Sequence, residues 1–320
     1  MFIWAGAHQG DVPREVVAEY LEEHDNVEIE LVEGSNAQMY PQMVAAKQAT
    51  PDEPLIHFGF FNVSTVYQGI ADDMWEPLNP ERIPNLANTF EQYVPPDNMA
   101  APFGMSTMGL MYNSDLVTDP PTSWSALWDP AYRGEVVAFD YQWQPLIVAA
   151  RLNGGSEHDI DPGFEVWSEN AANFKALVST NDALQNLIVS GDATLAMWFA
   201  SIWKIWADEG APLGFVTPEE GPVAFPTYLT IVKGVTDEQR RVAEDIINLL
   251  LEPKNAGRYA ELTYSVPLVK DAEVSDAVRN DPNFSPLLAE RAMQLDWAAM
   301  AQYNAEWRER WDREVKANID

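Results

Sequence analysis

The chain has 320 residues, 47% of them hydrophobic, with 19 Lys and Arg against 50 Asp and Glu, a net charge of −31, and no cysteine. That length exceeds what one compact core usually holds, so two lobes are expected. Such an acidic surface repels nucleic acid and anionic lipid, which disfavours a nucleic-acid partner. The lack of thiols excludes disulfides, thiolate catalysis and cysteine-based metal sites. The acidity either attracts a cationic solute or, as we favour, solvates the surface, as in a salt-adapted organism.

Strand and helix patterns alternate over the first hundred residues, in the order strand 2–4, helix from Asp11, strand 27–31, helix 39–47 and strand 54–59. Asp11-Val12-Pro13 is typical of a helix start, and residues 27–31 alternate apolar and acidic side chains as a half-exposed strand does. This alternation indicates a mostly parallel sheet covered by helices. The proline-rich stretch 74–101 is expected to be irregular.

The rest of the chain continues the series, with strands 102–113, 134–140, 195–198 and 221–232 and helices 145–152, 171–178, 183–190, 236–251 and 285–317. No flexible Gly/Ser linker is visible, so the two lobes are expected to be joined by extended strands near 104–112 and 223–231. Two crossings make the first lobe discontinuous, a hinge arrangement suited to closure around a ligand. The predicted domains are 1–104 plus 226–265, and 105–225 plus 266–320.

A search for catalytic and metal-binding motifs finds none. The four histidines, His8, His24, His57 and His158, share no metal-ligand spacing, and His57 is interpreted as a core or cleft residue. Nucleophile elbows, phosphate loops and dinucleotide fingerprints are missing from the sequence. We therefore predict a protein that is not an enzyme and uses no metal and no cofactor. No apolar run of about 18 residues predicts a membrane span.

The twelve tryptophans are the most unusual feature of the composition. Two pairs at helical spacing, Trp203 with Trp206 and Trp307 with Trp311, are expected to pack internally. Trp4, Trp143 and Trp198 differ because each follows or ends a predicted strand. In open α/β sheets ligands bind outside the carboxyl ends of strands, and an aromatic ring there offers an apolar face that also attracts cations.

Several segments together carry a resemblance to a known family. The clearest is the block 112–117 followed by PPTSWSALWDPAYRG at 120–134, and weaker matches follow the same order at 35–40, 191–198, 218–221 and 264–267. The chain resembles the extracellular solute-binding proteins of ABC importers, specifically the polyamine and iron(III)-type group. The resemblance implies an α/β, two-lobed periplasmic-binding-protein fold of type II with two crossover strands as hinge. It also implies a monomeric partner of a membrane permease.

The resemblance further implies a periplasmic or extracellular location. No signal-peptide pattern precedes the first strand, so the chain is either cytosolic or an exported protein whose signal is not part of this sequence. The resemblance favours the exported protein.

The family's ligand lies between the lobes, and its contact positions carry over onto ten residues of this sequence: Trp4, Phe60, Phe61, Ser106, Tyr141, Gln144, Trp198, Phe225, Thr227 and Tyr264. Polyamine-binding members have acidic residues where Tyr141, Gln144 and Thr227 stand, and an unpaired buried ammonium is costly. Asp140 supplies a counter-charge if the alignment shifts by one residue. The tyrosine pair of the iron-binding branch is also missing, since Tyr264 has no adjacent tyrosine.

We therefore expect an aromatic-lined interlobe cleft that captures a small polar organic solute by hinge closure. The solute is neutral, zwitterionic or a singly charged amine-like molecule. The alternative within the same class is a true putrescine- or spermidine-binding protein. Alternatives of other classes are an enzyme that uses the same cleft, and a chemosensory module that presents its closed form to a receptor.

Overall fold

The computed structural model describes residues 1–6 and 8–319, and the chain divides into two compact units. Unit 1 comprises Met1–Ser106 and Phe225–Glu290, and unit 2 comprises Thr107–Ala224 and Arg291–Asp320. The chain passes from one unit to the other inside strand β5 (Ala101–Asn113) and again inside strand β10 (Val223–Val232). No flexible linker is therefore needed. The mixture of strands and helices confirms the predicted α/β class.

Unit 1 contains a sheet whose first strands are parallel. β1 (Phe2–Trp4) lies between β2 (Val32–Gly34) and β3 (Phe58–Asn62) and runs parallel to both. β10 pairs antiparallel with β3 and places Thr227 opposite Asn62. Two short strands complete the sheet: β4 (Trp75–Glu76) pairs with β10, and β11 (Val266–Pro267) pairs with β5.

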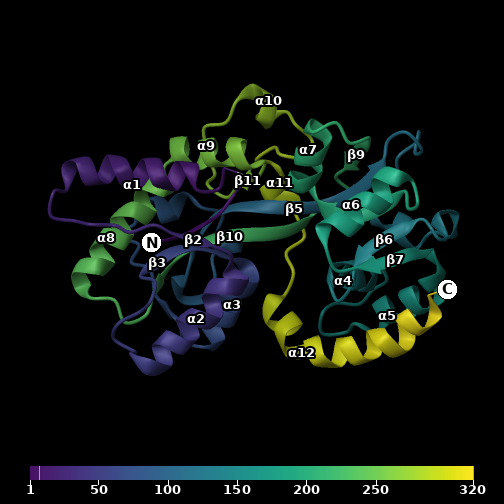
Figure 1. Cartoon of the computed structure of the whole chain (residues 1–320), viewed down its shortest axis with the longest axis horizontal. Coiled ribbons are helices and arrows are strands. Elements are labelled where there is room, and N and C mark those ends of the chain that lie inside the picture. The colour runs from purple at the N-terminus through teal and green to yellow at the C-terminus, as the bar shows by residue number, and fades with distance from the viewer. Residues whose placement is uncertain (7, 320) are drawn as a thin grey trace. The chain divides into compact units, whose positions relative to one another are not determined.

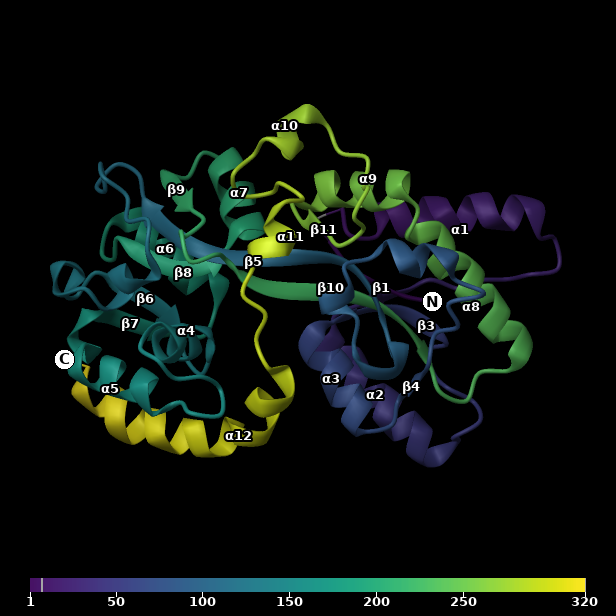
Figure 2. The same ribbon diagram turned by 180° about the vertical axis from the view of Figure 1, so that it is seen from behind.

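Helices cover both faces of the sheet of unit 1. α1 (Asp11–Glu23), α8 (Asp237–Leu250) and α9 (Pro253–Thr263) pack against one another on one face, and α2 (Asn36–Ala49) and α3 (Val63–Ala71) lie on the other (Figures 1 and 2). The short helix α10 (Asp276–Arg279) lies beyond β11. Residues 84–98 form three single turns of 3₁₀-helix, in agreement with the irregular stretch that the prolines predict.

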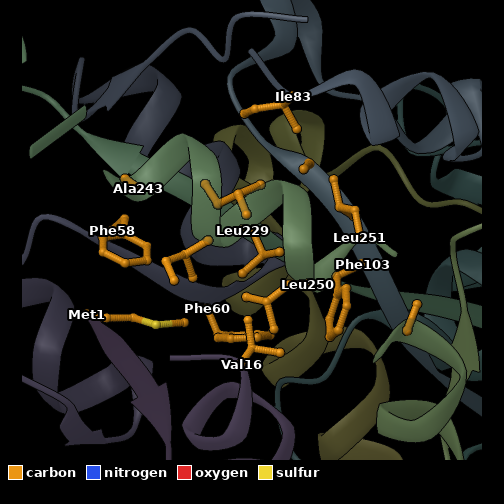
Figure 3. Packing of buried hydrophobic residues seen from close by; sticks show 14 of the residues in the cluster. Met1, Val16, Phe58, Phe60, Ile83, Phe103, Leu229, Ala243, Leu250 and Leu251 are labelled. Carbon is orange, nitrogen blue, oxygen red and sulfur yellow. The ribbon is translucent and has the colours of Figure 1, made fainter. Parts of the chain in front are cut away.

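The core of unit 1 follows from the sequence of α8. Thr236 accepts a hydrogen bond from the Gln239 backbone N–H, and the Gln239 side chain accepts one from the Thr236 N–H, which closes a capping box. The helix then buries Ala243, Ile246, Ile247 and Leu250, one face at intervals of three and four residues. Figure 3 shows Leu250 of α8 converging with Phe60 of β3, Leu229 of β10 and Val16 of α1. The predicted helix 236–251 is thus confirmed almost to the residue.

Unit 2 has a parallel group of three strands. β6 (Val136–Phe139) lies between β7 (Phe174–Val178) and β8 (Leu195–Phe199) and runs parallel to both. β8 and β9 (Leu213–Val216) pair antiparallel with the second half of β5. The helices between these strands are α4 (Gln144–Leu152), α5 (Asp161–Glu169), α6 (Asn181–Ser190) and α7 (Ala200–Asp208).

The C-terminal segment of unit 2 is helical and lies beside α5 (Figure 2). It follows the short helix α11 (Leu288–Arg291) and comprises α12 (Trp297–Arg310), a π-helical turn (Trp311–Val315) and a 3₁₀ turn (Lys316–Asn318). Trp307 and Trp311 pack edge-on against Trp143, with ring centroids 6.0 and 6.2 Å apart. The predicted internal packing of Trp307 and Trp311 is confirmed. Trp143, expected at a strand end, belongs to this aromatic core as well.

Four predicted elements differ in the structure. The helix predicted at 285–317 is interrupted, because residues 292–296 are not helical and Met293 forms a bridge with Val223. Residues 27–31 form no strand, because β1 pairs with residues 32–34 instead, placing Phe2 opposite Val32. The strand predicted at 54–59 begins only at Phe58. The helix predicted at 171–178 is a 3₁₀ turn followed by β7, because residues 176–178 pair with β6. Short apolar runs have no period that separates a strand from a buried helix, so the pairing partner decides.

The first two boundaries between the units lie close to the predicted ones, but the third boundary differs. Residues 266–290, expected in the second lobe, group with unit 1. The reason is β11, where Val266 pairs with Met105 and Pro267 with Gly104, and the Leu268 N–H donates to the Phe103 carbonyl over 3.0 Å. Within residues 1–6 and 8–319, no helix combines the length and the apolar character that crossing a membrane requires.

Candidate binding site

The strand ends of unit 2 gather three of the predicted site residues. Because β6 and β8 are parallel, their carboxyl ends meet at one edge of the sheet, where α/β proteins bind ligands. Asp140 and Tyr141 follow β6, and Trp198 lies near the end of β8. Tyr141 has a φ of +57°, a left-handed conformation that turns the chain sharply toward α4, which begins at Gln144. Local turn geometry and sheet pairing therefore place these four residues at the same edge.

Three of these residues carry a buried polar atom without a hydrogen-bond partner among the described residues: Asp140 Oδ1, Gln144 Oε1 and Trp198 Nε1. Gln144 is 6% and Trp198 is 2% exposed. An unpaired buried polar group costs about 1–3 kcal/mol, so three of them at one sheet edge need a functional explanation. Two further unpartnered atoms, Thr230 Oγ1 and Trp311 Nε1, lie elsewhere, on β10 of unit 1 and in the aromatic core of unit 2.

The ring of Trp198 is held by its neighbours on the sheet. Phe139, at the end of β6, stacks on it with centroids 4.3 Å apart and planes 12° apart. Phe199 contacts it edge-on at 5.3 Å. The tryptophan ring therefore contributes to packing, while its indole N–H remains available as a hydrogen-bond donor.

Tyr141 lies against the C-terminal segment of the chain. Its hydroxyl donates to Asp312 Oδ1 over 2.9 Å and accepts from Lys316 Nζ over 3.2 Å. The guanidinium carbon of Arg308 lies 3.8 Å from the ring centroid, and Lys316 Nζ lies 4.5 Å from it. The aromatic side chain that the sequence assigns to a ligand is thus in contact with two cations of the chain itself.

Lys316 also binds Asp140. Its ammonium group donates to Asp140 Oδ2 over 2.7 Å and lies 3.4 Å from Asp312 Oδ1. Burial alone would lower the pKa of Lys316, but the hydrogen bonds to Asp140 and Tyr141 outweigh it and raise that pKa above its ordinary value. Lys316 is therefore charged at neutral pH and neutralises the carboxylate that the sequence offered as a counter-charge. Sequence patterns gave no signal for this contact, which spans 176 residues.

The strand ends of unit 1 are tied together by two asparagines. Asn36, the first residue of α2, donates to the Phe60 carbonyl over 3.4 Å and accepts from the Asn62 N–H over 3.0 Å. Asn62, at the end of β3, caps α3 by accepting from the Thr65 N–H over 2.9 Å. Thr227 of β10 is buried opposite Asn62, at the same edge. These side chains hold the loop geometry that follows the strands.

The aromatic residues predicted for unit 1 have different surroundings. Phe60 and Phe61 are buried in the core, Phe60 within 6 Å of the rings of Phe103 and Tyr259, and Phe61 against Phe2 and Trp75. Trp4, at the end of β1, is partly exposed and lies 6.5 Å from Phe60 between ring centroids. Trp4 thus packs against the core of unit 1 but, unlike Phe60 and Phe61, keeps part of its surface exposed.

The three remaining predicted residues are partly exposed and belong to unit 1. Ser106 is its last residue on β5, and Phe225 its first on β10. Tyr264 ends α9 in a left-handed conformation, with a φ of +50°, and its ring lies 5.7 Å from Phe284.

A cavity of about 840 Å³ opens in unit 1 at the other edge of the sheet. Its lining includes Met1 and His57 at the amino ends of strands, and Tyr20, Glu238 and Asp245 of the helices above. None of the ten predicted residues lines it. In the described part of the chain, no group of three or more His, Asp or Glu side chains is placed to hold a metal ion.

Comparisons with known proteins identify the family and the fold. The model of a family described as bacterial extracellular solute-binding protein matches residues 56–292, which is more than half of the chain. A spermidine/putrescine-binding periplasmic protein of Salmonella typhimurium is 28% identical over 212 residues. This match spans 63% of the chain and 59% of the Salmonella protein, so the chain matches less than two thirds of that relative's length.

Solved structures resemble the chain over nearly its whole length. An ABC transporter structure from Clostridium perfringens has a TM-score of 0.82 and 18% identity, and the match covers 98% of this chain and 99% of that one. The periplasmic binding protein AfuA of Actinobacillus pleuropneumoniae, solved with fructose-6-phosphate bound, has a TM-score of 0.69 and 17% identity over 99% and 98% of the two chains. At identities this low, the structural similarity shows the fold alone. It confirms the predicted two-lobed fold class.

Proposed function

We propose, on the premise that the chain belongs to the family of bacterial extracellular solute-binding proteins, that it is the solute-binding receptor of an ABC importer. It works outside the cytoplasmic membrane as a monomer, captures a small polar organic solute and delivers it to a membrane permease. The observation that carries this proposal is the group of unpartnered buried polar atoms at the strand ends of unit 2, on Asp140, Gln144 and Trp198. A binding protein leaves such atoms for its ligand to satisfy.

The chemistry of these atoms limits the solute. Asp140 Oδ1 and Gln144 Oε1 accept hydrogen bonds, and Trp198 Nε1 donates one. A solute that donates two hydrogen bonds and accepts one, such as a primary amide or a pair of hydroxyls, supplies partners for all three atoms. The charge of Asp140 is already balanced by Lys316, so Asp140 offers this solute no uncompensated negative charge. We therefore favour a neutral or zwitterionic solute over a cation at this end of the site.

The name of the Salmonella relative supports the alternative, a putrescine or spermidine receptor. The AfuA structure supports a broader choice, because a protein of the same fold was solved with a sugar phosphate. The residues of this chain favour the broader choice. Tyr141, Gln144 and Thr227 are neutral where the polyamine-binding pattern requires acids, and unpaired ammonium groups are costly to bury.

We also propose that the chain binds its solute without transforming it. This follows the role of the family to which it belongs. Mass spectrometry of a bound compound after prolonged incubation tests this directly, because a changed mass would revive the enzyme hypothesis.

A thermal-shift screen tests the proposed receptor. Ligand that binds only the folded state stabilises it by about 2.7 kcal/mol at a hundredfold excess over Kd. The screen compares polyols, amides, zwitterionic amino compounds, sugar phosphates, putrescine and spermidine. We expect the largest increase in Tm from a neutral or zwitterionic compound. A largest shift from putrescine or spermidine would establish the polyamine alternative, and no shift from any class would contradict the receptor itself.

A further inference from the structure

We propose that Lys316 occupies an amine-recognition site of unit 2 in cis and thereby excludes solutes that would present an ammonium group there. The inference rests on the proposed function and concerns the solute class. It assigns to the C-terminal segment, far from the predicted site residues in sequence, the role of determining specificity.

The surroundings of the Lys316 ammonium are those of a bound alkylammonium ligand. A carboxylate oxygen of Asp140 lies 2.7 Å away, and the Tyr141 hydroxyl lies 3.2 Å away. The Tyr141 ring centroid is 4.5 Å away, which is within the range of a cation–π contact. A carboxylate together with an aromatic face is the combination by which proteins recognise organic amines. Here the chain supplies the amine as well.

The position of this contact links it to solute binding. Asp140 follows β6 at the carboxyl edge of the parallel strands, and its second oxygen, Oδ1, has no partner among the residues described. Lys316 thus binds one carboxylate oxygen of Asp140, and the other has no partner among the described residues. A neutral donor of the solute satisfies Oδ1 while Lys316 keeps Oδ2. An ammonium group of the solute would instead meet the Lys316 and Arg308 charges beside Tyr141, which repel it. The carboxylates at this position, Asp140 and Asp312, already contact Lys316 at 2.7 and 3.4 Å.

The ion pair between Lys316 and Asp140 is partly exposed to solvent. The Lys316 side chain is 31% exposed and that of Asp140 is 21% exposed, so the pair is open to competition from solvent. Because Lys316 is part of the same chain, its effective concentration at Asp140 is on the order of millimolar or higher. A free amine at micromolar concentration does not displace it. Removal of the lysine charge is therefore expected to open the site.

The experiment compares three variants with the wild-type protein. Lys316→Met removes the charge and keeps the aliphatic stem, and Lys316→Arg keeps the charge. The double variant Asp140→Asn, Lys316→Met removes both partners. The probes are butylammonium and its neutral counterpart 1-butanol, with Kd measured by calorimetry. Thermal unfolding is measured to check that each variant folds.

We expect Lys316→Met to bind butylammonium at least about tenfold more tightly than the wild type, because a charged hydrogen bond to a carboxylate becomes available. Lys316→Arg should bind butylammonium as weakly as the wild type does. The double variant should lose the gain in butylammonium affinity. The Kd of 1-butanol should be the same for all four proteins. A change of less than threefold in Lys316→Met overturns the proposal, and so does a gain that persists in the double variant, since Asp140 would then not be the partner.

The result is separable from the receptor proposal. A solute screen of the wild-type protein that yields no ligand contradicts the proposed function, whatever the amine probe shows. Conversely, a solute found by the screen together with an unchanged butylammonium affinity in Lys316→Met contradicts the role of Lys316 alone.

Discussion

Gln144 is the side chain at the strand ends of unit 2 for which we expect stability and solute binding to be in conflict. It begins α4, is almost fully buried, and has an oxygen without a hydrogen-bond partner in the described part of the molecule. Burial without a partner lowers the stability of the ligand-free protein. The same oxygen strengthens binding if the solute donates to it.

This reasoning predicts opposite effects of one substitution. Gln144→Met keeps an unbranched side chain of similar size but removes the unpartnered oxygen. We expect an unchanged or higher free energy of unfolding, by up to about 1 kcal/mol, and solute binding weakened about three- to tenfold. Urea denaturation and calorimetry measure the two quantities.

Thr230→Val is the matched control, since Thr230 Oγ1 is equally unpartnered but lies on β10 of unit 1, within a stretch paired with β3. It should raise stability without changing affinity. If Gln144→Met binds the solute as well as the wild type does, the Gln144 oxygen does not contact it.

Substitutions of Phe60 and Trp4 should distinguish a residue that packs in the core of unit 1 from one that binds the solute. Phe60→Ala removes a buried ring from the core and should cost about 3–5 kcal/mol of unfolding free energy. Phe60→Leu keeps most of the volume and should leave solute affinity unchanged. Trp4→Ala should cost less stability, since Trp4 is partly exposed, but should weaken binding. Equal losses of affinity in Phe60→Leu and Trp4→Ala would show instead that the Phe60 ring contacts the solute.

At the scale of elements, the C-terminal segment is joined to the end of β6 by charged groups. Lys316 binds Asp140 and Tyr141, Asp312 accepts from Tyr141, and Arg308 covers the Tyr141 ring. Aromatic packing of Trp307 and Trp311 on Trp143 supports the same contact from the core side. The segment is therefore part of unit 2 and not an appendage.

The pH dependence of this contact follows from the direction of the Lys316 pKa. That pKa is raised in the folded state above its ordinary value of 10.5. The stabilisation is therefore complete below pH 10.5 and is lost as the pH rises through the folded pKa. We expect the Tm difference between the wild type and Lys316→Met to stay constant from about pH 6 to about pH 10 and to shrink only at higher pH. A difference that already falls below pH 9 would contradict the assignment.

At the scale of the whole molecule, the net charge of −31 predicts a salt-dependent stability. Raising NaCl from about 0.1 M to about 1 M shortens the screening length from roughly 10 Å to roughly 3 Å and reduces repulsion among the surface carboxylates. We expect Tm to increase over this range. Sucrose at matched osmolarity separates screening from osmotic effects. A Tm that rises equally with sucrose, or not at all with NaCl, would show that self-repulsion does not limit stability.

Hinge closure stays a prediction, and it concerns the molecule as a whole. The chain passes between its units inside two extended strands, β5 and β10, and a third time at Glu290 and Arg291 of α11. The two strands suit a hinge of few residues. We expect saturating solute to reduce the radius of gyration measured by small-angle X-ray scattering. Gln144→Met should need a higher solute concentration for the same change. An unchanged radius at full saturation would exclude closure.

The sequence alone predicted the elements whose signals are local. The capping box and spaced apolar residues specify α8, and the long apolar run specifies β5, because helix caps and side-chain periodicity act over a few residues. The ordered motifs around 112–134 identified the family, which the family match confirms. The same reasoning placed Tyr141, Gln144 and Trp198 after or near strands, where the structure has them at one sheet edge.

Only the tertiary structure decided what each side chain meets. Residues 174–178 became a strand because β6 was there to pair with, and residues 266–290 joined unit 1 through β11. Phe60 and Phe61 are buried in the core, and Tyr141 contacts cations that lie more than 160 residues away in sequence. Such contacts are set by packing between distant segments, and their energies depend on burial and distance, which periodicity and motif spacing do not encode.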